Sequence, residues 1–468
     1  MELTAYTSVI ARFGQELAEL FVNQEGDGDV GELAQRARVL DADMATLLRA
    51  IGCEAMQQVY ATLTAQEVQQ CHQVGLTIHR NPQIEFHVIF GTIALDSPYL
   101  WTPGVSAKPV RDVLGITHHG RSETVNRALS DFGAEVSFEQ AASRFAEHYH
   151  YALSRSTVDR VTKDVAQEAL DFVQFRLALA AEHGVPPVSA PTDVETLLIE
   201  LDGCKIRTGQ RQLVWPAPVA DPETDVVGEA AAVSASMPLM GPPQQKKPIT
   251  WKEVRLGLAR PVTAKDKLYV GRISPGYTDV VQDLHRIAIW AGLRDGTEVV
   301  AVADGGNGLR EALEREFAVW SFQFILDRRH LTEHLYATAD ALRIPGDERT
   351  AWVDNWRGLL NEGAIHYTIQ ELTTLFHQTN EHRVEQLIAY LERFCDATHY
   401  EDFQFCGYPI GSGEIESAHK SVPQHRLKLP GACWHPRSLD PMMGLRLVRA
   451  NNWWDEFWED RTARKCAA

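Results

Sequence analysis

The sequence has few basic residues for its size and no long apolar segment. Its 468 residues include 45 Lys and Arg against 63 Asp and Glu, a formal net charge of −18. Such an acidic balance argues against nucleic acid, whose partners normally present basic surfaces. The longest apolar run, residues 86–95 with one histidine, is shorter than the roughly 20 residues that span a membrane, and no signal peptide begins at Met1. These absences predict a cytoplasmic protein.

Paired cysteines are also missing. The seven cysteines are scattered and never form a CxxC pair, which argues against a disulfide framework and against a zinc ribbon. Hydrophobic residues make up 44% of the chain and charged residues 23%, as in globular proteins. At roughly 100–200 residues per domain, the length predicts two to four domains.

The N-terminal region reads as mainly helical. Residues 1–80 carry apolar residues at helical spacing, and residues 1–70 contain 11 acidic and 4 basic side chains, so an acidic helical segment is expected there. The β-branched and aromatic stretch 84–96 predicts one or two strands.

A helix-turn-helix is predicted at about 138–165, within a DNA-binding region spanning 81–183. A first helix covers 138–148, and Ser154 or Ser156 would cap a short second helix with apolar residues at helical spacing. In such motifs the second helix enters the major groove. Plain helical hairpins share this pattern, so both interpretations stay open. The side chains expected to face DNA are Arg155, Ser156, Thr157 and Arg160.

Beyond the Pro-rich linker 184–193, the pattern alternates between strands and helices. Three strands followed by two helix–strand units give the order βββαβαβ, which predicts an α/β, ribonuclease-H-like fold with a mixed five-stranded sheet. This core would occupy 194–330, an all-helical insertion 331–405, and the last helix and tail 406–468. The predicted strands are 195–201, 251–259, 267–270, 298–303 and 322–326, and the predicted helices are 278–291, 309–317 and one from about 329.

Three acidic residues fall where this sheet would bring them together. Asp202 and Asp304 end the first and fourth predicted strands, and Glu416 lies in the first turn of the last helix. Carboxylates without thiols suit Mg²⁺ or Mn²⁺, and a pair of such ions can promote attack on a phosphodiester. Each acid also has a plainer interpretation, because Asp-Gly is a common turn signal and Glu stabilises a helix N-terminus. Taken together, the three positions favour a metal site.

A further group follows the fifth strand, where Asp327, His330 and His334 are spaced to share one helix face. His330, Glu333 and His334 also match HxxEH, an inverted zinc-peptidase motif. A zinc site needs a third protein ligand, and this interpretation leaves Asp202 and Asp304 unexplained. The zinc peptidase is therefore the weaker alternative.

Several motifs together resemble a known family. ELDG, WKEVRLG, VADGG, ILDRRHLTEHL and PIGSGEIES followed by HRLK are similar to the bacterial insertion-sequence transposases of the ISKra type, relatives of the Mutator-like group. The resemblance spans roughly 112–454. It implies a catalytic and metal-binding triad of Asp202, Asp304 and Glu416, with Asp327 and His330 supporting the site. Glu416 is preferred to Glu414 because the family's acid lies three residues after the second glycine of GSG.

The resemblance also implies a function. A transposase of this type would use Mg²⁺ or Mn²⁺ to cleave DNA at the element's terminal inverted repeats and to join the 3′-hydroxyl to target DNA. It would act as a homo-oligomer in the bacterial cytoplasm, at the nucleoid when bound to DNA. An alternative is a domesticated transposase that serves as a DNA-binding regulator.

Local basic segments are compatible with DNA despite the overall charge. Residues 246–272 hold eight basic and two acidic side chains, a net charge of +6, and residues 419–449 hold six and one, a net charge of +5. Both segments adjoin the predicted catalytic elements and would neutralise phosphates. The residues of the second segment expected to contact DNA are Lys420, Arg426 and Lys428.

Overall fold

The computed structural model describes residues 7–23, 31, 34, 40–183, 191–214, 244–246, 248–274 and 276–467. The chain divides into two compact units, Met1–Ala128 with Ser143–Leu153 and Leu129–Ala142 with Ser154–Ala468. The predicted boundaries near residues 183, 330 and 405 therefore fall inside the second unit. Most of the predicted linker and of the loop from 216 to 248 lies outside the described residues.

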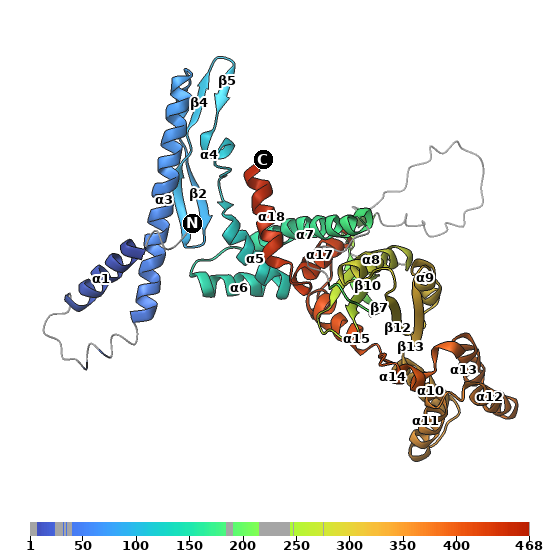
Figure 1. Ribbon diagram of the computed structural model, residues 1–468. Coiled ribbons are helices and arrows are strands. Elements are labelled where there is room, and N and C mark those ends of the chain that lie inside the picture. The colour runs from blue at the N-terminus through green and yellow to red at the C-terminus, as the bar shows by residue number, and fades with distance from the viewer. Residues whose placement is uncertain are drawn as a thin grey trace, which may run out of the picture. The chain divides into compact units, whose positions relative to one another are not determined.

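The first unit combines two long helices with short strands (Figure 1). The predicted strands over 84–96 are confirmed as an antiparallel pair, whose apolar side chains form a core with Tyr60 of the second helix. The remaining strands are two to four residues long, too short for any periodicity to predict them. The elements are α1 (Thr7–Asn23), α3 (Leu40–Gln73), β1 (Thr77–Arg80), β2 (Gln83–Val88), β3 (Gly91–Asp96), β4 (Tyr99–Thr102), β5 (Val105–Ala107), α4 (Pro109–Asp112) and β6 (Gly120–Arg121).

The predicted helix-turn-helix region contains α5 (Glu123–Glu135), α6 (Phe138–Tyr149) and α7 (Arg155–His183). The cap is as predicted, because the Ser154 hydroxyl accepts a hydrogen bond from the Thr157 backbone N–H at 3.2 Å. The expected short second helix is wrong: α7 has 29 residues. Its buried apolar face continues to Ala180, since this helix packs along α17 (Leu439–Ala450) in the second unit.

The second unit is built on a mixed five-stranded sheet in the order β11-β10-β7-β12-β13. β10 runs antiparallel to both of its neighbours, whereas β7, β12 and β13 are parallel. This is the predicted set of five strands in the predicted sequence order. The elements are β7 (Thr196–Gly209), β10 (Ile249–Pro261), β11 (Leu268–Ile273), α8 (Thr278–Trp290), β12 (Glu298–Ala303), α9 (Leu309–Glu316) and β13 (Ser321–Leu326), with a small pair β8 (Gln212–Val214) and β9 (Gln244–Lys246).

Helices pack on this sheet, and further helices come after its last strand in the sequence. α8 packs on β10 and β11, and α17 packs on β11 and α7. Residues 331–405 contain helices and turns only, as predicted (Figure 1). No described helix combines the length and the apolar character that crossing a membrane requires. The remaining helices are α10 (Arg328–Ala341), α11 (Gly346–Asn361), α12 (Ile365–Thr379), α13 (His382–Arg393), η2 (Cys395–Ala397), α14 (Tyr400–Phe405), α15 (Gly413–His419), η3 (Lys420–Gln424), α16 (His425–Leu427), η4 (Pro436–Ser438) and α18 (Trp454–Ala467).

The first strand of the core is longer than predicted. Asp202 does not end β7, which continues to Gly209 because thirteen residues of β10 pair with it. The parallel pairing with β12 does end at Glu200. Beyond that point β7 and β10 continue as a two-stranded ribbon, and Asp202 is the second residue after the parallel pairing stops.

Candidate active site at the carboxyl edge of the sheet

Three aspartates share one level at the carboxyl edge of the parallel strands. Val302 pairs with Glu200 and Ala303 pairs with Leu326. Continuing both registers by one or two residues places Asp304 beside Asp202 on one side and beside Asp327 on the other. The carboxyl ends of strands in an α/β sheet are where such folds place their sites. The register therefore gathers two of the predicted ligands and one predicted supporting residue at one edge.

Asp327 is held rigidly. Its side chain is fully buried, and it caps α10 by accepting the Arg329 backbone N–H at 2.8 Å. The other carboxylate oxygen accepts hydrogen bonds from the Ser412 hydroxyl at 2.5 Å and from His330 Nδ1 at 2.8 Å. Burial opposes ionisation, but these donors outweigh it and lower the pKa of Asp327. These hydrogen bonds fix the Asp327 carboxylate in place, and the oxygen that accepts from Arg329 keeps a lone pair, so Asp327 is a positioning residue that also belongs to a group of potential metal ligands.

His330 is the charged partner in this pair. The hydrogen bond to Asp327 raises the pKa of His330 to about 9, and the nearby Asp304 carboxylate adds to the effect. The imidazole is therefore a cation at neutral pH. In this form His330 donates one hydrogen bond to Asp327 and can donate a second to an anion at the edge of the sheet.

Asp202 and Asp304 are less constrained. Each is partly exposed, and each accepts a backbone N–H from a nearby residue: Asp202 from Gly203 at 2.6 Å and Asp304 from Gly306 at 2.9 Å. Among the described residues, no ion pair involves Asp304. Partly exposed carboxylates at a strand edge fit the donor set that Mg²⁺ and Mn²⁺ prefer.

The helix that carries Glu416 is fixed to the sheet. The buried Glu200 of β7 accepts the Ile415 backbone N–H at 2.7 Å. Glu414 forms ion pairs with Arg260 at 2.7 Å and with Lys267 at 2.9 Å. Glu414 is thus committed to a structural contact with the β10 side of the sheet. This supports the choice of Glu416 over Glu414 as the functional carboxylate.

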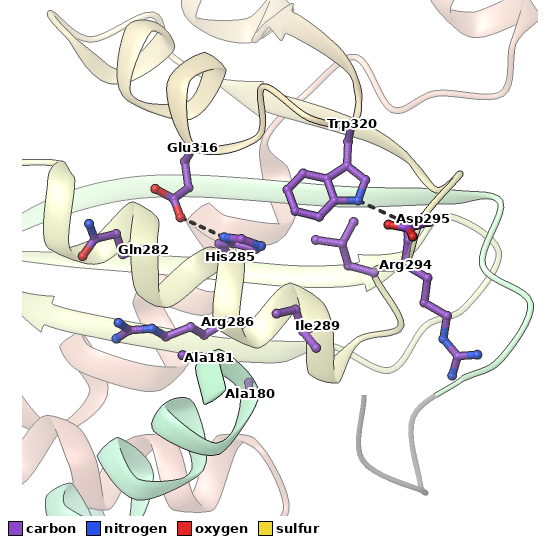
Figure 2. Close-up of a pocket in the computed structure, with 11 residues that line it drawn as sticks. Ala180, Ala181, Gln282, His285, Arg286, Ile289, Arg294, Asp295, Glu316 and Trp320 are labelled. Atoms are coloured by element: carbon purple, nitrogen blue, oxygen red, sulfur yellow. Dashed lines mark hydrogen bonds and ion pairs between the residues drawn. The ribbon is translucent and has the colours of Figure 1, made fainter. Parts of the chain in front are cut away.

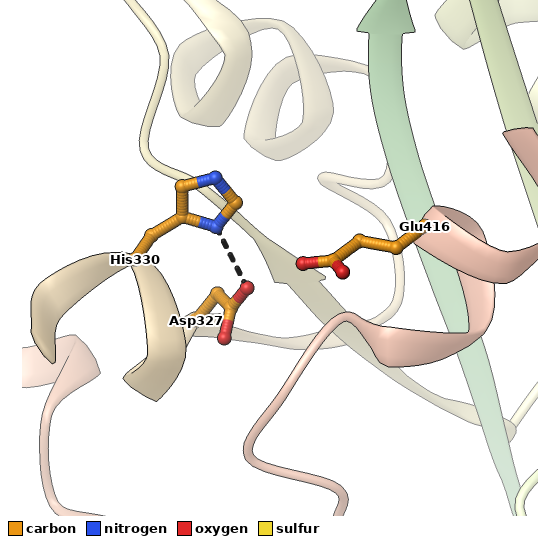
Figure 3. Close-up of side chains that lie close together, drawn as sticks. All are labelled: Asp327, His330 and Glu416. Atoms are coloured by element: carbon orange, nitrogen blue, oxygen red, sulfur yellow. Dashed lines mark hydrogen bonds and ion pairs between the residues drawn. The ribbon is translucent and has the colours of Figure 1, made fainter. Parts of the chain in front are cut away.

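Glu416 points from α15 toward Asp327 and His330 (Figure 3). Ligand atoms of these three residues lie within 4.8 Å of one another. Among the described residues, Asp202 and Asp304 do not join such a group with Glu416. Glu416 is instead paired with the Arg329 guanidinium, which is 65% exposed. The exposed Arg329 guanidinium therefore occupies the position beside Glu416 that a metal cation would take.

Two buried groups escaped the sequence analysis. Burial raises the pKa of Glu200 to about 8, although the Ile415 N–H opposes the shift. His419 of α15 is 2% exposed, its Nε2 lies 3.7 Å from an Asp202 oxygen, and burial lowers its pKa. The signal for Glu200 was one acid inside the apolar run 197–201. No sequence signal pointed to His419, because its position beside Asp202 depends on how α15 packs against β7.

The zinc-peptidase motif is not assembled as a ligand set. His334 stacks on Tyr390 with ring centroids 4.3 Å apart, and its Nδ1 lies 3.4 Å from Arg383. Glu333 is exposed and pairs with Arg329 at 3.4 Å. Within the described residues, neither joins His330 in a group of potential metal ligands.

A cavity of about 830 Å³ lies elsewhere in the second unit (Figure 2). Arg294 and Trp320, which line it, precede β12 and β13, so the cavity adjoins the amino ends of these strands, opposite the aspartates. Two of its polar contacts are made within the lining: His285 with Glu316 at 2.8 Å, and Trp320 Nε1 with the Arg294 carbonyl at 3.1 Å. The cavity is therefore not part of the candidate active site.

The predicted DNA-contacting residues differ in accessibility. Arg155, Ser156, Arg160, Lys420 and Lys428 are exposed, and Thr157 is half-buried. Arg426 is only 3% exposed, because its guanidinium lies over the rings of Phe138 and Trp434 and donates to the Gly133 carbonyl at 2.8 Å. Arg426 is therefore part of the packing and not a surface phosphate contact. DNA binding by the exposed residues stays a prediction.

Comparison with known proteins gives weak similarities only. No protein-family model and no curated protein matches the sequence. Among solved structures, the chain is similar to the Mos1 strand transfer complex, with 10% identity over 59% of this chain and 77% of that chain, at a TM-score of 0.16. A Mos1 transposase paired-end complex with left transposon end gives 11% identity, 60% and 79% coverage, and a TM-score of 0.15. TM-scores this low carry no argument about fold or function.

Proposed function

We propose that this protein is a DDE-type transposase with a ribonuclease-H-like core, which cleaves DNA at the ends of an insertion sequence and transfers the cleaved strand to target DNA. The observation that carries the proposal is the strand register, which sets Asp202 beside Asp304 at the carboxyl edge of the sheet. The fixed helix α15 adds Glu416 beside Asp327 and His330. The sheet supports the fold assignment, because an antiparallel trio followed by two parallel strands is the expected order.

In this proposal Asp202, Asp304 and Glu416 hold the divalent ions. Bound Mg²⁺ or Mn²⁺ would activate the attacking hydroxyl and stabilise the leaving oxygen of the phosphodiester. Asp327 fixes the start of α10 and, through Ser412, the loop before α15, so it sets the position of Glu416. The His330 cation faces this edge and would hold a phosphate oxygen. Joining two element ends would require at least two copies of the chain.

The test is a cleavage assay with the full chain. Labelled duplexes carrying the DNA that flanks the gene are incubated with Mg²⁺, and a second assay follows the joining of a pre-cut 3′-hydroxyl end to a plasmid. We expect both reactions from the unmodified protein and at least a hundredfold loss for Asp202→Asn, Asp304→Asn or Glu416→Gln, since each removes a ligand charge. Nicking that survives Asp304→Asn would refute the assigned chemistry.

Glu333→Gln tests the zinc-peptidase alternative, because it removes a carboxylate on the same helix as His330 that is 58% exposed and that pairs with Arg329. We expect it to leave DNA cleavage unchanged, whereas a zinc peptidase would lose its general base. Sequence-specific binding without cleavage by the unmodified protein would favour the DNA-binding regulator instead.

A further inference from the structure

A second cavity, of about 700 Å³, lies beside the ribbon that β7 and β10 form beyond the aspartates. Lys205 and Arg207 of β7, Trp251 of β10 and Lys428 line it, together with residues 429–432. We call this feature the basic groove. It was not anticipated as a unit, because its residues come from three separate stretches of sequence.

The wall of the groove is rigid. The segment after α16 runs along the edge of β7 that β12 leaves free, where the Trp434 N–H donates to the Arg207 carbonyl at 3.1 Å and the Gly209 N–H donates to the Trp434 carbonyl at 2.9 Å. The Trp434 indole N–H donates a hydrogen bond to the Leu427 carbonyl at 3.0 Å, which joins the two ends of the segment 427–434. Gly431 takes a positive φ of 76° in the turn between them.

Alternation along the strands gives the groove one basic face. Arg207 pairs with Trp251 and Lys205 pairs with Glu253, and directly paired residues of antiparallel strands project to the same side. Lys205, Arg207 and Trp251 therefore share a face. Trp251 is 61% exposed. A large ring left so open marks a binding surface.

The cations of the groove are available. Lys205, Arg207 and Lys428 form no ion pair with any described residue. The adjacent acid, Glu253, pairs instead with the buried Arg255 at 3.2 Å. The groove therefore keeps three unneutralised positive charges in a protein whose net charge is −18.

The groove leads away from the candidate active site. At about 3.4 Å per residue, Lys205 lies roughly 10 Å and Arg207 roughly 17 Å beyond Asp202 along β7. Lys428 lines the same groove as Lys205 and Arg207. Nucleic acid that leaves the aspartates in this direction would meet the three cations in succession.

We propose that the basic groove binds a short unpaired stretch of DNA next to the cleavage point, with Trp251 stacked on a base and with Lys205, Arg207 and Lys428 on the phosphates. This inference rests on the proposed function. Cations with an interleaved aromatic ring are the combination that holds single-stranded nucleic acid. In a duplex the bases are already stacked on one another, so Trp251 would have no base face to contact.

The experiment measures DNA binding by fluorescence anisotropy with the full chain in EDTA. The probes are a fluorescein-labelled 15-nucleotide oligo-dT and a blunt 15-base-pair duplex. Trp251→Ala should weaken oligo-dT binding about tenfold or more, Trp251→Phe should retain most of the affinity, and duplex binding should change less than twofold. Lys205→Ala with Arg207→Ala should also weaken oligo-dT binding.

Matched controls lie on the same unit but away from the groove. Phe405→Ala removes a ring that is 93% exposed, and Arg315→Ala removes an exposed cation of α9. Neither should alter binding of oligo-dT. Equal weakening of duplex and oligo-dT binding by Trp251→Ala would overturn the single-strand assignment. Unchanged oligo-dT binding in all groove variants, or competition by polyglutamate in preference to oligo-dT, would overturn DNA as the ligand.

A failure of the groove proposal can be distinguished from a failure of the proposed cleavage chemistry. Asp304→Asn should bind oligo-dT like the unmodified protein while losing cleavage. Oligo-dT binding that depends on Trp251 in a protein that cleaves no DNA would leave the groove standing and remove the transposase. If cleavage is intact and oligo-dT binding does not depend on Trp251, the transposase proposal stands and the groove proposal is refuted.

Discussion

At the scale of single residues, Asp304 and Asp327 follow neighbouring parallel strands but use their oxygens differently. Asp327 is buried and accepts hydrogen bonds from two side chains and one backbone N–H, whereas Asp304 is partly exposed and accepts one from its own turn. Position along a strand does not separate a structural carboxylate from a ligand. Asp304 and Asp327 differ instead in burial and in the number of hydrogen bonds that each carboxylate accepts.

This difference predicts that the two aspartates contribute unequally to stability. Asp327→Asn removes the charge that His330 and Ser412 contact, and disrupting such a buried network costs about 1–3 kcal/mol, so the melting temperature should fall by several degrees. Asp304→Asn should leave it within about a degree, since partly exposed positions tolerate such changes. Differential scanning calorimetry in EDTA measures both. A larger loss for Asp304→Asn would contradict the assignment of roles.

Arg329 leads to a prediction about metal affinity. In the absence of metal its guanidinium neutralises Glu416, so cation binding must displace it. An exposed ion pair contributes about 0.2–1 kcal/mol, and Arg329→Ala should therefore tighten Mn²⁺ binding up to about fivefold. Mn²⁺ binding followed by electron paramagnetic resonance measures this directly. Arg349→Ala, which breaks a comparable pair with Asp340, is the control and should have no effect; weaker Mn²⁺ binding in Arg329→Ala would show that the arginine supports the site.

At the scale of elements, the packing of α17 on α7 depends on one glycine. A Cβ added to Gly444 would lie 2.6 Å from the Leu170 Cα, a backbone atom that cannot move aside. Gly444→Ala should therefore destabilise the second unit by about 1–3 kcal/mol. Gly358, inside α11, has nothing within 4 Å, so Gly358→Ala should stabilise by about 0.5–1 kcal/mol through helix propensity. Urea unfolding followed by circular dichroism compares the two; equal effects would mean that the helices are not in close contact.

The elements also show how far the sequence predicts the fold. The mainly apolar stretches 298–303 and 322–326 predicted the ends of β12 and β13 to within one residue. A parallel strand that is covered on both faces consists mainly of apolar residues, so its sequence is easily recognised. β7 was predicted to stop at the Asp202-Gly203 turn signal, and its pairing with β10 overrode that local preference. The length of α7 was missed for a similar reason, since its second half is held by a helix almost 300 residues later in the chain.

The candidate site was predictable to the same extent. The order of the strands predicted that Asp202 and Asp304 lie at one edge of the sheet, whereas the position of Asp327 beside Asp304 became clear only from the register of β12 and β13. The contacts between distant segments were not predictable: Ser412 with Asp327, Glu200 with Ile415 and Arg329 with Glu416. Nor was the burial of Arg426, since a charge count does not distinguish an arginine stacked on Phe138 from one in solvent.

At the scale of the whole molecule, the net charge is −18 and only some of the positive charges are free of internal ion pairs. Several arginines and lysines of the two basic segments are committed to internal ion pairs, such as Arg260 and Lys267 with Glu414. The available positive charge is correspondingly local. Attraction for DNA should therefore come from a few defined cations and not from the general field of the protein.

This uneven charge predicts how DNA binding responds to salt. Each phosphate neutralised on a single strand contributes about −0.7 to the slope of log K against log salt, so three groove cations predict a slope of about −2 for oligo-dT. Lys205→Ala should reduce that slope by about 0.7, because it removes one phosphate contact, and Trp251→Ala should lower affinity without changing the slope, because stacking releases no counterions. Anisotropy titrations between 50 and 200 mM NaCl in EDTA measure both quantities, with Arg315→Ala as the control. A slope that Lys205→Ala leaves unchanged would place the phosphate contacts outside the basic groove.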